Sequence, residues 1–139
     1  MTYALDTNMI IHYLKDTPNV VNNLIATIKR GDSLVIPPIV DYEIKRGFCV
    51  QSSPKKERAY KILTEESLGV CDVPSMDSDS WERAEKVYAE LYQKRFTVGE
   101  LDMLIAAFCL VNDCTLVTNN KKDFASIDGI VVVDWTKDE

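Results

Sequence analysis

The sequence predicts an α/β fold, in which a central parallel sheet of about five strands lies between two layers of helices. Short apolar runs alternate with longer amphipathic segments along the whole chain, and no repeat, linker or low-complexity segment interrupts them. Such alternation is typical of a parallel sheet covered on both faces. We expect residues 1–139 to form a single domain, because this length is usual for one core.

The first predicted strand, Tyr3–Leu5, ends abruptly at Asp6. Thr7 or Asn8 is expected to cap the helix that follows. Ligands bind at the carboxyl edge of open α/β sheets, and an unpaired buried carboxylate is costly. Asp6 therefore marks the candidate site. The apolar residues of the following helix are Ile10, Ile11 and Leu14.

A second acid is expected near the end of the second strand. A helix is predicted from Pro18 to Gly31, followed by the strand Leu34–Ile36. Pro37 and Pro38 break this strand and suit the first turn of a helix over residues 39–49. Glu43 then lies about one turn into that helix.

The middle of the chain predicts two more helices around a third strand. A charged helix starts at Ser53-Pro54, Leu68–Pro74 forms a turn and a strand, and Asp77–Arg95 is a long amphipathic helix. The apolar residues expected to pack these helices and the one from Pro18 are Val20, Val21, Leu24, Ile25, Ile28, Tyr60, Ile62, Leu63, Trp81, Ala84, Val87, Tyr88 and Leu91.

Two further acids occur in the last third of the chain. Asp102 lies in the first turn of an apolar helix predicted over Glu100–Asn112. Asp123 follows the fourth strand, Leu116–Val117, and Ile130–Val133 is the last strand. Trp135 is expected to pin the C-terminal tail.

The composition restricts the classes of function. The net charge is −6 and the pI about 4.8, which argues against a general nucleic-acid binder but not against an enzyme with a local basic patch. Neither a secretory signal nor a membrane span is evident. The four cysteines lack Cys-x-x-Cys spacing, so we expect reduced, buried thiols in the cytoplasm. With His12 as the only histidine, a zinc site is not expected.

Four acids follow strand ends or open helices: Asp6, Glu43, Asp102 and Asp123. Parallel strands bring their carboxyl ends to one edge, so these acids are expected to converge. Clustered carboxylates raise one another's pKa, and a hard divalent cation such as Mg²⁺ or Mn²⁺ relieves the repulsion. Such a site can hold a phosphate and activate water. The neutral polar residues expected at the same edge are Thr7, Asn8, Thr118 and Asn119.

Each acid alone also has a structural explanation. Asp6 and Asp102 could act only as helix caps, and acids near any helix N-terminus are favoured by the helix dipole. Four acids at strand ends are harder to explain in this way. Asp72 is expected to be an ordinary surface acid of a strand, and His12 a packed or surface side chain rather than a catalytic one.

Four segments resemble motifs of the PIN-domain family, and most of all its VapC toxins from type II toxin–antitoxin systems. In chain order they are Leu5–Asn8, Glu43–Gly47, Gly99–Ala107 and Leu116–Phe124. The resemblance implies a three-layer α/β/α sandwich, an Mg²⁺-dependent endoribonuclease, a homodimer and inhibition by a VapB antitoxin.

The resemblance also implies roles for individual residues. Its metal-binding acids correspond to Asp6, Glu43, Asp102 and Asp123, while Thr118 and Asn119 shape the site. Whether Asp123 or a neighbouring asparagine, Asn119 or Asn120, completes the site stays open. Glu100 is an additional acid close to Asp102 in sequence.

Hydrolysis of RNA needs a proton acceptor and basic contacts. Glu43 or Asp123 is expected to accept the proton of the attacking water, and the basic residues that flank the acids are Lys45, Arg46, Lys121 and Lys122. Two alternatives remain. One is a PIN-like module that binds RNA or protein without cutting. The other is a haloacid-dehalogenase-like phosphohydrolase, which is disfavoured because Asn8 stands where that chemistry needs a second acid.

Overall fold

The computed structural model describes residues 1–65 and 69–137, and its centre is a five-stranded sheet. All neighbouring strands pair in parallel, in the order β3-β2-β1-β4-β5. The predicted fold class is confirmed. The strands are β1 (Thr2–Leu5), β2 (Ser33–Val35), β3 (Cys71–Asp72), β4 (Thr115–Val117) and β5 (Val132–Val133). Leu68, the first residue of the segment predicted to form a turn and the third strand, lies outside the described residues.

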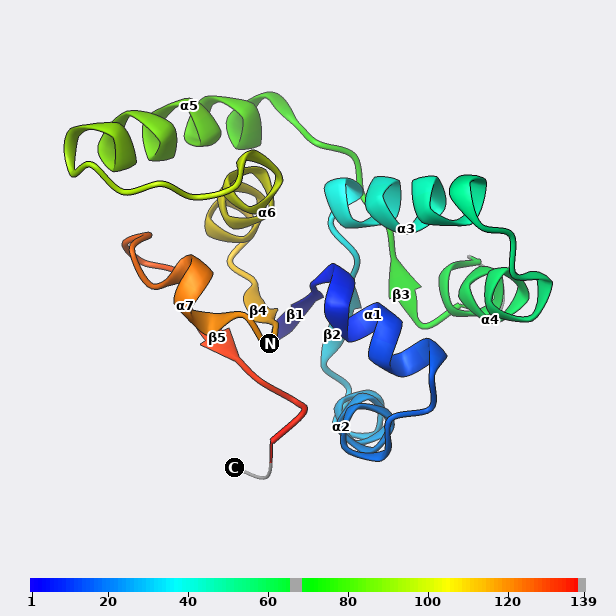
Figure 1. Cartoon of the computed structure of the whole chain (residues 1–139). Coiled ribbons are helices and arrows are strands. Elements are labelled where there is room, and N and C mark those ends of the chain that lie inside the picture. Colours follow the sequence, from blue (N-terminus) through cyan, green and yellow to red (C-terminus); the bar gives the residue numbers. More distant parts are fainter. Residues whose placement is uncertain (66–68, 138–139) are drawn as a thin grey trace.

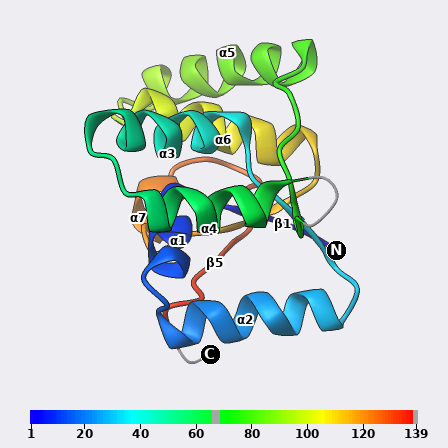
Figure 2. The ribbon, with the colours of Figure 1, turned by 90° about the vertical axis from the view of Figure 1, so that its right-hand side faces the viewer.

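Seven helices in the described residues cover this sheet. They are α1 (Thr7–Leu14), α2 (Pro18–Lys29), α3 (Pro38–Val50), α4 (Pro54–Thr64), α5 (Ser78–Gln93), α6 (Glu100–Val111) and α7 (Lys121–Phe124). The chain moves outward from β1 to β3 through α1–α4 and then returns past β1 to β4 and β5 through α5–α7. In Figures 1 and 2, α3 lies with α5 and α6 on one side of the sheet and contacts α6, whereas α2 lies on the other side. In both views, α5 lies beside α6 at one end of the molecule and α2 lies at the other.

The register of the sheet aligns the ends of its central strands. Leu5 pairs with Val117 across β1 and β4, and Ala4 pairs with Val35 across β1 and β2. The backbone N–H of Asp6 continues the ladder with a 3.0 Å hydrogen bond to the carbonyl of Val117. The strand order reverses between β1 and β4, which is where open α/β sheets bind ligands.

The core is built from apolar side chains of the central strands and of the inner faces of the helices. Several residues predicted to pack inward are instead exposed: Ile11, Ile25, Ile28, Ile62, Trp81 and Tyr88. The helices that carry these residues keep one side in solvent, so a residue at the margin of an apolar stripe remains exposed. Trp135 is buried as predicted, with its ring centroid 5.7 Å from that of Tyr3.

All four cysteines are free thiols, and three of them are buried as predicted. Cys49 is the exception, because it is exposed at the next-to-last residue of α3. Within the described residues, no helix combines the length and the apolar character needed to cross a membrane.

Four helices end in the same hydrogen-bonding pattern, with one residue in the left-handed region directly after the cap. These residues are Asp16 (φ 57°), Gly31 (φ 79°), Arg95 (φ 59°) and Asp113 (φ 52°), after α1, α2, α5 and α6. In each case the next backbone N–H bonds back to a carbonyl five residues earlier. This is the Schellman motif, which satisfies carbonyls that the helix leaves free.

Two helix starts differ from the prediction. The N-cap of α1 is Asp6 itself, whose carboxylate accepts a hydrogen bond from the N–H of Thr7, so neither Thr7 nor Asn8 is the cap. The short helix α7 was not predicted, because four residues are too few to show a helical period.

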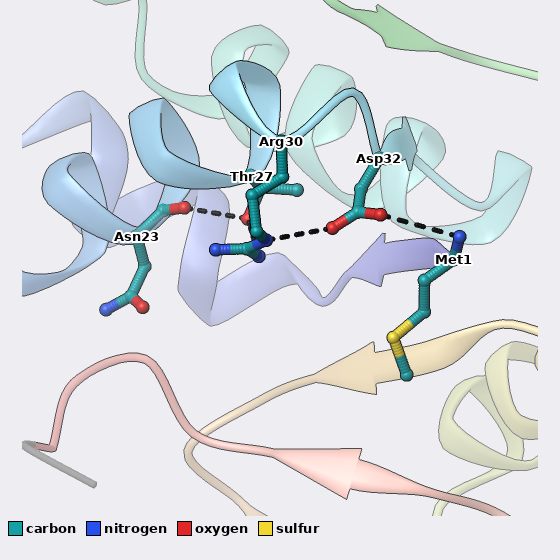
Figure 3. A network of polar contacts seen from close by, with 5 residues as sticks. All are labelled: Met1, Asn23, Thr27, Arg30 and Asp32. Atoms are coloured by element: carbon teal, nitrogen blue, oxygen red, sulfur yellow. Dashed lines mark hydrogen bonds and ion pairs between the residues drawn. The ribbon is translucent and has the colours of Figure 1, made fainter.

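A polar network fixes the turn between α2 and β2 against the start of β1 (Figure 3). Arg30 Nε lies 3.1 Å from Asp32 Oδ2, and Arg30 Nη2 donates to the hydroxyl of Thr27, which donates to the carbonyl of Asn23. Asp32 Oδ1 also lies 3.5 Å from the Met1 amino group. Arg30 lowers the pKa of the Asp32 carboxyl. The network holds the amino edge of the sheet, opposite the edge that carries Asp6.

Candidate active site

Asp6 is buried at the junction of β1 and α1, and three donors hold its carboxylate. The N–H of Thr7 donates to Oδ1 at 2.8 Å, while the Asn8 amide and the Thr118 hydroxyl donate to Oδ2 at 3.2 and 2.7 Å. Burial raises the pKa of Asp6, and these hydrogen bonds oppose the rise without cancelling it. The carboxylate is therefore fixed in orientation and costly to ionise.

Thr118 connects the two strand ends that border this site. Its fully buried hydroxyl accepts hydrogen bonds from the amide of Asn8 at 3.3 Å and from the N–H of Asn120 at 3.1 Å. The N–H of Asn119 donates to Asn8 Oδ1 at 3.4 Å. The polar residues predicted at this edge thus form one network around Asp6.

Glu43 reaches the same edge from α3. The hydroxyl of Thr7 donates to Glu43 Oε1 at 2.9 Å, and Arg46 Nη2 lies 3.9 Å from Oε2. The guanidinium of Arg46 also lies 5.2 Å from the ring centroid of Tyr42. Thr7 therefore bridges two of the predicted acids, since its backbone N–H binds Asp6 and its side chain binds Glu43.

Asp102 stands among the other acids at the start of α6. Burial, followed by the charges of Asp6, Asp123 and Glu43 in that order, raises the pKa of Asp102 to about 6. Gly99 is the N-cap residue of α6 and has no side chain to offer its first amides. Asp6, Asp123 and Glu43 are thus close enough to raise the pKa of the Asp102 carboxyl.

The donor set suits a hydrated divalent cation rather than a protein cage. The available ligands are carboxylate, hydroxyl and amide oxygens, which hard cations prefer. In the part of the chain that the structure describes, no three His, Cys, Asp or Glu side chains are close enough to hold one ion together. Hard divalent cations that keep part of their hydration shell need only one or two carboxylates, and the oxygen donors at this edge are of the kind that such cations prefer.

Two hollows open on either side of the acids. The Glu43 hollow, of about 460 Å³, is lined by Thr7 and Glu43 together with residues of α1, α3 and the start of α4. The Asp102 hollow, of about 470 Å³, is lined by Asp102 and Asp123 together with Phe96 and Lys122. Phe96 was not predicted to lie at the site, although an aromatic residue in a polar segment after a helix end could have indicated it.

The remaining predicted residues lie at different distances from this edge. Lys121 and Lys122 begin α7, and Lys122 lines the Asp102 hollow. Lys45 Nζ lies 3.1 Å from Asp41, and two residues along a helix are about 200° apart, so Lys45 faces away from Glu43. Glu100 is exposed at the first position of α6, and no hydrogen bond or ion pair within the described residues joins it to the four acids.

His12 lies beside the polar network rather than among the acids. Its Nδ1 is 3.0 Å from the hydroxyl of Thr17, and its Nε2 is 3.4 Å from the amide nitrogen of Asn119. A neutral imidazole satisfies both contacts, with a proton on Nδ1 and an acceptor at Nε2. The side chain is half-buried, so this geometry fits a packing role.

Comparisons with known proteins find relatives along almost the whole chain. The family model described as PIN domain matches residues 3–130. Ribonuclease VapC1 of Haemophilus influenzae is 30% identical over 99% of this chain and 100% of its own length. The tRNA(fMet)-specific endonuclease VapC of Shigella flexneri is 26% identical over 98% and 99%. The structure of VapBC-1 from nontypeable H. influenzae matches with a TM-score of 0.85 at 28% identity, covering 99% and 100%.

Proposed function

The chain belongs to the PIN domain family, and from this premise we propose that it is the toxin of a VapBC-like type II toxin–antitoxin system. We propose that it acts as a metal-dependent endoribonuclease, which hydrolyses RNA phosphodiester bonds at the edge of the sheet. The observations that carry the proposal are that Thr7 hydrogen-bonds both Asp6 and Glu43, and that Asp102 and Asp123 line the same hollow. In support, burial and then the charges of the other three acids raise the pKa of Asp102 to about 6.

The acids divide into two groups by their surroundings. Asp6 and Asp102, whose pKa values are raised by burial, would hold the cation, because carboxylates that are costly to ionise gain most from a positive charge. Glu43 is half-buried and Asp123 is exposed, and one of them would accept the proton of the attacking water. Thr7, Asn8, Thr118 and Asn119 would keep the carboxylates in orientation.

The proposed cofactor is Mg²⁺, with Mn²⁺ as the alternative, because both prefer oxygen ligands. When bound, the cation supplies positive charge to the acids and to the phosphate under attack. Without it, the four carboxylates would repel the RNA backbone. The acidic net charge of the chain makes this neutralisation necessary.

RNA contacts would come from basic side chains on both sides of the acids. Arg46 lies beside Glu43, and Lys122 lines the Asp102 hollow, so the two flank the path of a bound strand. Lys121 and Lys45 are weaker candidates by position. The name of the S. flexneri relative, a tRNA(fMet)-specific endonuclease, makes transfer RNA the first substrate class to test.

The proposed protein partners are a VapB-like antitoxin and a second copy of this chain. The VapBC-1 structure is the main support for the antitoxin. Large apolar side chains exposed on the helices, including Ile25, Ile28 and Ile62, give the surface the character of interaction sites. Light scattering of the purified chain tests the homodimer.

The test of the enzyme is cleavage of total bacterial RNA by the purified chain, with Mg²⁺ or with EDTA. Asp6→Asn and Asp102→Asn should abolish cleavage while the fold is retained. Asp72→Asn is the matched control, because Asp72 is an exposed acid in β3 outside the site. Discrete fragments that require Mg²⁺, Asp6 and Asp102 but not Asp72 would support the proposal.

Other outcomes would select between the alternatives. Cleavage that persists in EDTA or in Asp6→Asn would contradict the proposed site. RNA binding without cleavage by the folded chain would favour a PIN-like binding module. A haloacid-dehalogenase-like phosphohydrolase, disfavoured by Asn8, would instead hydrolyse small phosphate esters.

A further inference from the structure

We propose that Phe96 is a stacking platform for one unpaired nucleobase of the RNA, beside the phosphate that is cleaved. The inference rests on the proposed ribonuclease function and deepens it, because it assigns a base-binding residue beside the acids. It starts from the position of one exposed aromatic ring in the same hollow as two of the acids.

Phe96 is an unusual residue for this position. Its side chain is 53% exposed, although phenylalanine is normally buried. It lines the Asp102 hollow together with Asp102 and Asp123. Within the described part of the chain, the ring has no aromatic or cationic partner. A large apolar surface therefore faces solvent directly beside the acidic site.

The backbone that carries the exposed ring is held in place. The Schellman motif at the end of α5 uses the N–H of Phe96, which donates to the carbonyl of Leu91 at 2.9 Å. The preceding residue, Arg95, adopts φ 59° and donates to the carbonyl of Tyr92 at 3.2 Å. Phe96 also lines a small cavity with Leu91 and Tyr92. A platform fixed by backbone hydrogen bonds loses little entropy when a base stacks on it.

The walls of the Asp102 hollow fit the separate parts of a nucleotide. The phenyl ring offers a face for stacking, and Lys122 offers a positive charge for a phosphate. The hydroxyls of Thr97 and Ser126 also line the hollow and offer hydrogen-bonding groups for the edge of a base. Asp102 and Asp123 lie at the same hollow, where the scissile phosphate would meet the cation.

Two other occupants fit this hollow less well. An apolar side chain of a protein partner would cover Asp102, Asp123 and Lys122 without pairing their charges, which is costly. A base within a duplex would not present its face, because it is already stacked on its neighbours. Bases that stack on aromatic side chains come from single-stranded loops, bulges and ends.

The experiment compares substitutions that change only the aromatic face. Phe96→Leu keeps an apolar side chain but removes the π system, and Phe96→Trp enlarges it. Trp81→Leu is the matched control, because Trp81 is 47% exposed at the opposite end of α5 and does not line the hollow. The substrate is a short single-stranded RNA that carries the cleavage site mapped with total RNA.

For Phe96→Leu we expect KM to rise by roughly tenfold or more, in the range of base–aromatic stacking, with a smaller change in kcat. Phe96→Trp should restore or lower KM relative to Phe96→Leu because it keeps an aromatic face, and Trp81→Leu should stay near wild type. A second readout uses the same RNA with 2-aminopurine next to the cleaved bond, in Ca²⁺ and on the Asp6→Asn background. Stacking should quench its fluorescence, and Phe96→Leu should abolish the quenching.

Several results would overturn the proposal. Unchanged KM and unchanged quenching in Phe96→Leu would do so while leaving the ribonuclease intact. Loss of the dimer in Phe96→Leu, seen by light scattering together with unchanged quenching, would assign the ring to a protein interface. If the wild type cuts no RNA, the proposed function fails, and quenching of a single-stranded oligouridylate that carries one internal 2-aminopurine then decides whether a base stacks on Phe96.

Discussion

The hydroxyl of Thr118 donates a 2.7 Å hydrogen bond to Asp6 Oδ2 across the boundary between β1 and β4. Both residues are almost fully buried, and they follow the two strands that flank the reversal of the strand order. A hydrogen bond to a carboxylate is stronger than one between neutral groups. Thr118 therefore both orients the candidate metal-binding acid and reduces the cost of its burial.

Thr118→Val should lower stability and RNA cleavage together. Valine keeps the shape of threonine but leaves the buried Asp6 carboxylate with one donor fewer. We expect the free energy of unfolding to fall by about 2 kcal/mol, because hydrogen bonds to charged groups contribute about that much. Chemical denaturation measures the loss, and cleavage of total RNA measures the effect on the site.

Thr118→Ser is the control for this prediction. It retains the hydroxyl and removes one methyl group, at a cost of about 1 kcal/mol or less. Serine should therefore recover most of the cleavage that valine loses. Equal loss in the two variants would mean that packing at Thr118, rather than its hydrogen bond to Asp6, maintains the site.

Asp102→Asn should stabilise the metal-free protein above pH 6. The pKa of Asp102 rises from its ordinary value of 3.8 to about 6 in the folded state. Between these values the folded state binds more protons than the unfolded state, so stability falls as the pH rises. Asparagine removes this loss, which we expect to be roughly 1 kcal/mol after solvent screening of the half-buried group.

The measurement is thermal unfolding in EDTA from pH 4 to pH 8. The wild type should lose stability across the interval from pH 4 to pH 6 relative to Asp102→Asn, and the difference should be constant above it. Asp72→Asn should follow the wild-type curve, since Asp72 is exposed. Parallel curves for wild type and Asp102→Asn would contradict the electrostatic coupling of the four acids.

The sequence was sufficient to predict the sheet and the edge at which the site lies. Apolar runs that end in Asp6 and Thr118 indicated strand ends, and parallel strands bring such ends together whatever lies between them in sequence. The five strands and the six longer helices follow from hydrophobic periodicity. The position of each acid along its element could therefore be predicted.

The finer geometry depended on contacts between distant segments, which no local pattern reveals. Sequence analysis placed Lys45 beside the site because it is close to Glu43 in sequence, whereas its ammonium pairs with Asp41. It also missed Phe96, whose position follows from the left-handed turn at Arg95. Arginine gives no signal for such a turn, unlike the glycine at position 31.

An Arg46→Ala, Lys122→Ala double variant should bind RNA more weakly and with less dependence on salt. Arg46 lies beside Glu43 and Lys122 lines the Asp102 hollow, so we expect both to contact the phosphates of one strand. For single-stranded RNA, each lost phosphate contact makes the slope of log K (the association constant) against log salt shallower by about 0.7. Loss of both contacts should therefore make it shallower by about 1.4. Fluorescence anisotropy with a labelled RNA over a salt series measures this slope.

Lys45→Ala provides the comparison for the double variant. Its ammonium is 3.1 Å from Asp41 on the far side of α3, so we expect its salt slope to match that of the wild type. An unchanged slope in the double variant would remove Arg46 and Lys122 from the RNA path. A reduced slope in Lys45→Ala would show that the strand also crosses the outer face of α3.

Arg95→Gly should stabilise the protein. Arg95 is held at φ 59°, a left-handed backbone conformation that costs any residue other than glycine roughly 1 kcal/mol. Glycine removes this strain, but it also increases the conformational entropy of the unfolded chain, which opposes folding. We therefore expect the free energy of unfolding to rise by only about 0.5 kcal/mol. Thermal unfolding should show a rise in the midpoint of roughly 1–2 °C.

Gln93→Gly, inside the last turn of α5, is the control. It should instead lower the midpoint, because helical backbone disfavours glycine. A lower midpoint for Arg95→Gly would mean that its side chain makes a stabilising contact that outweighs the backbone strain.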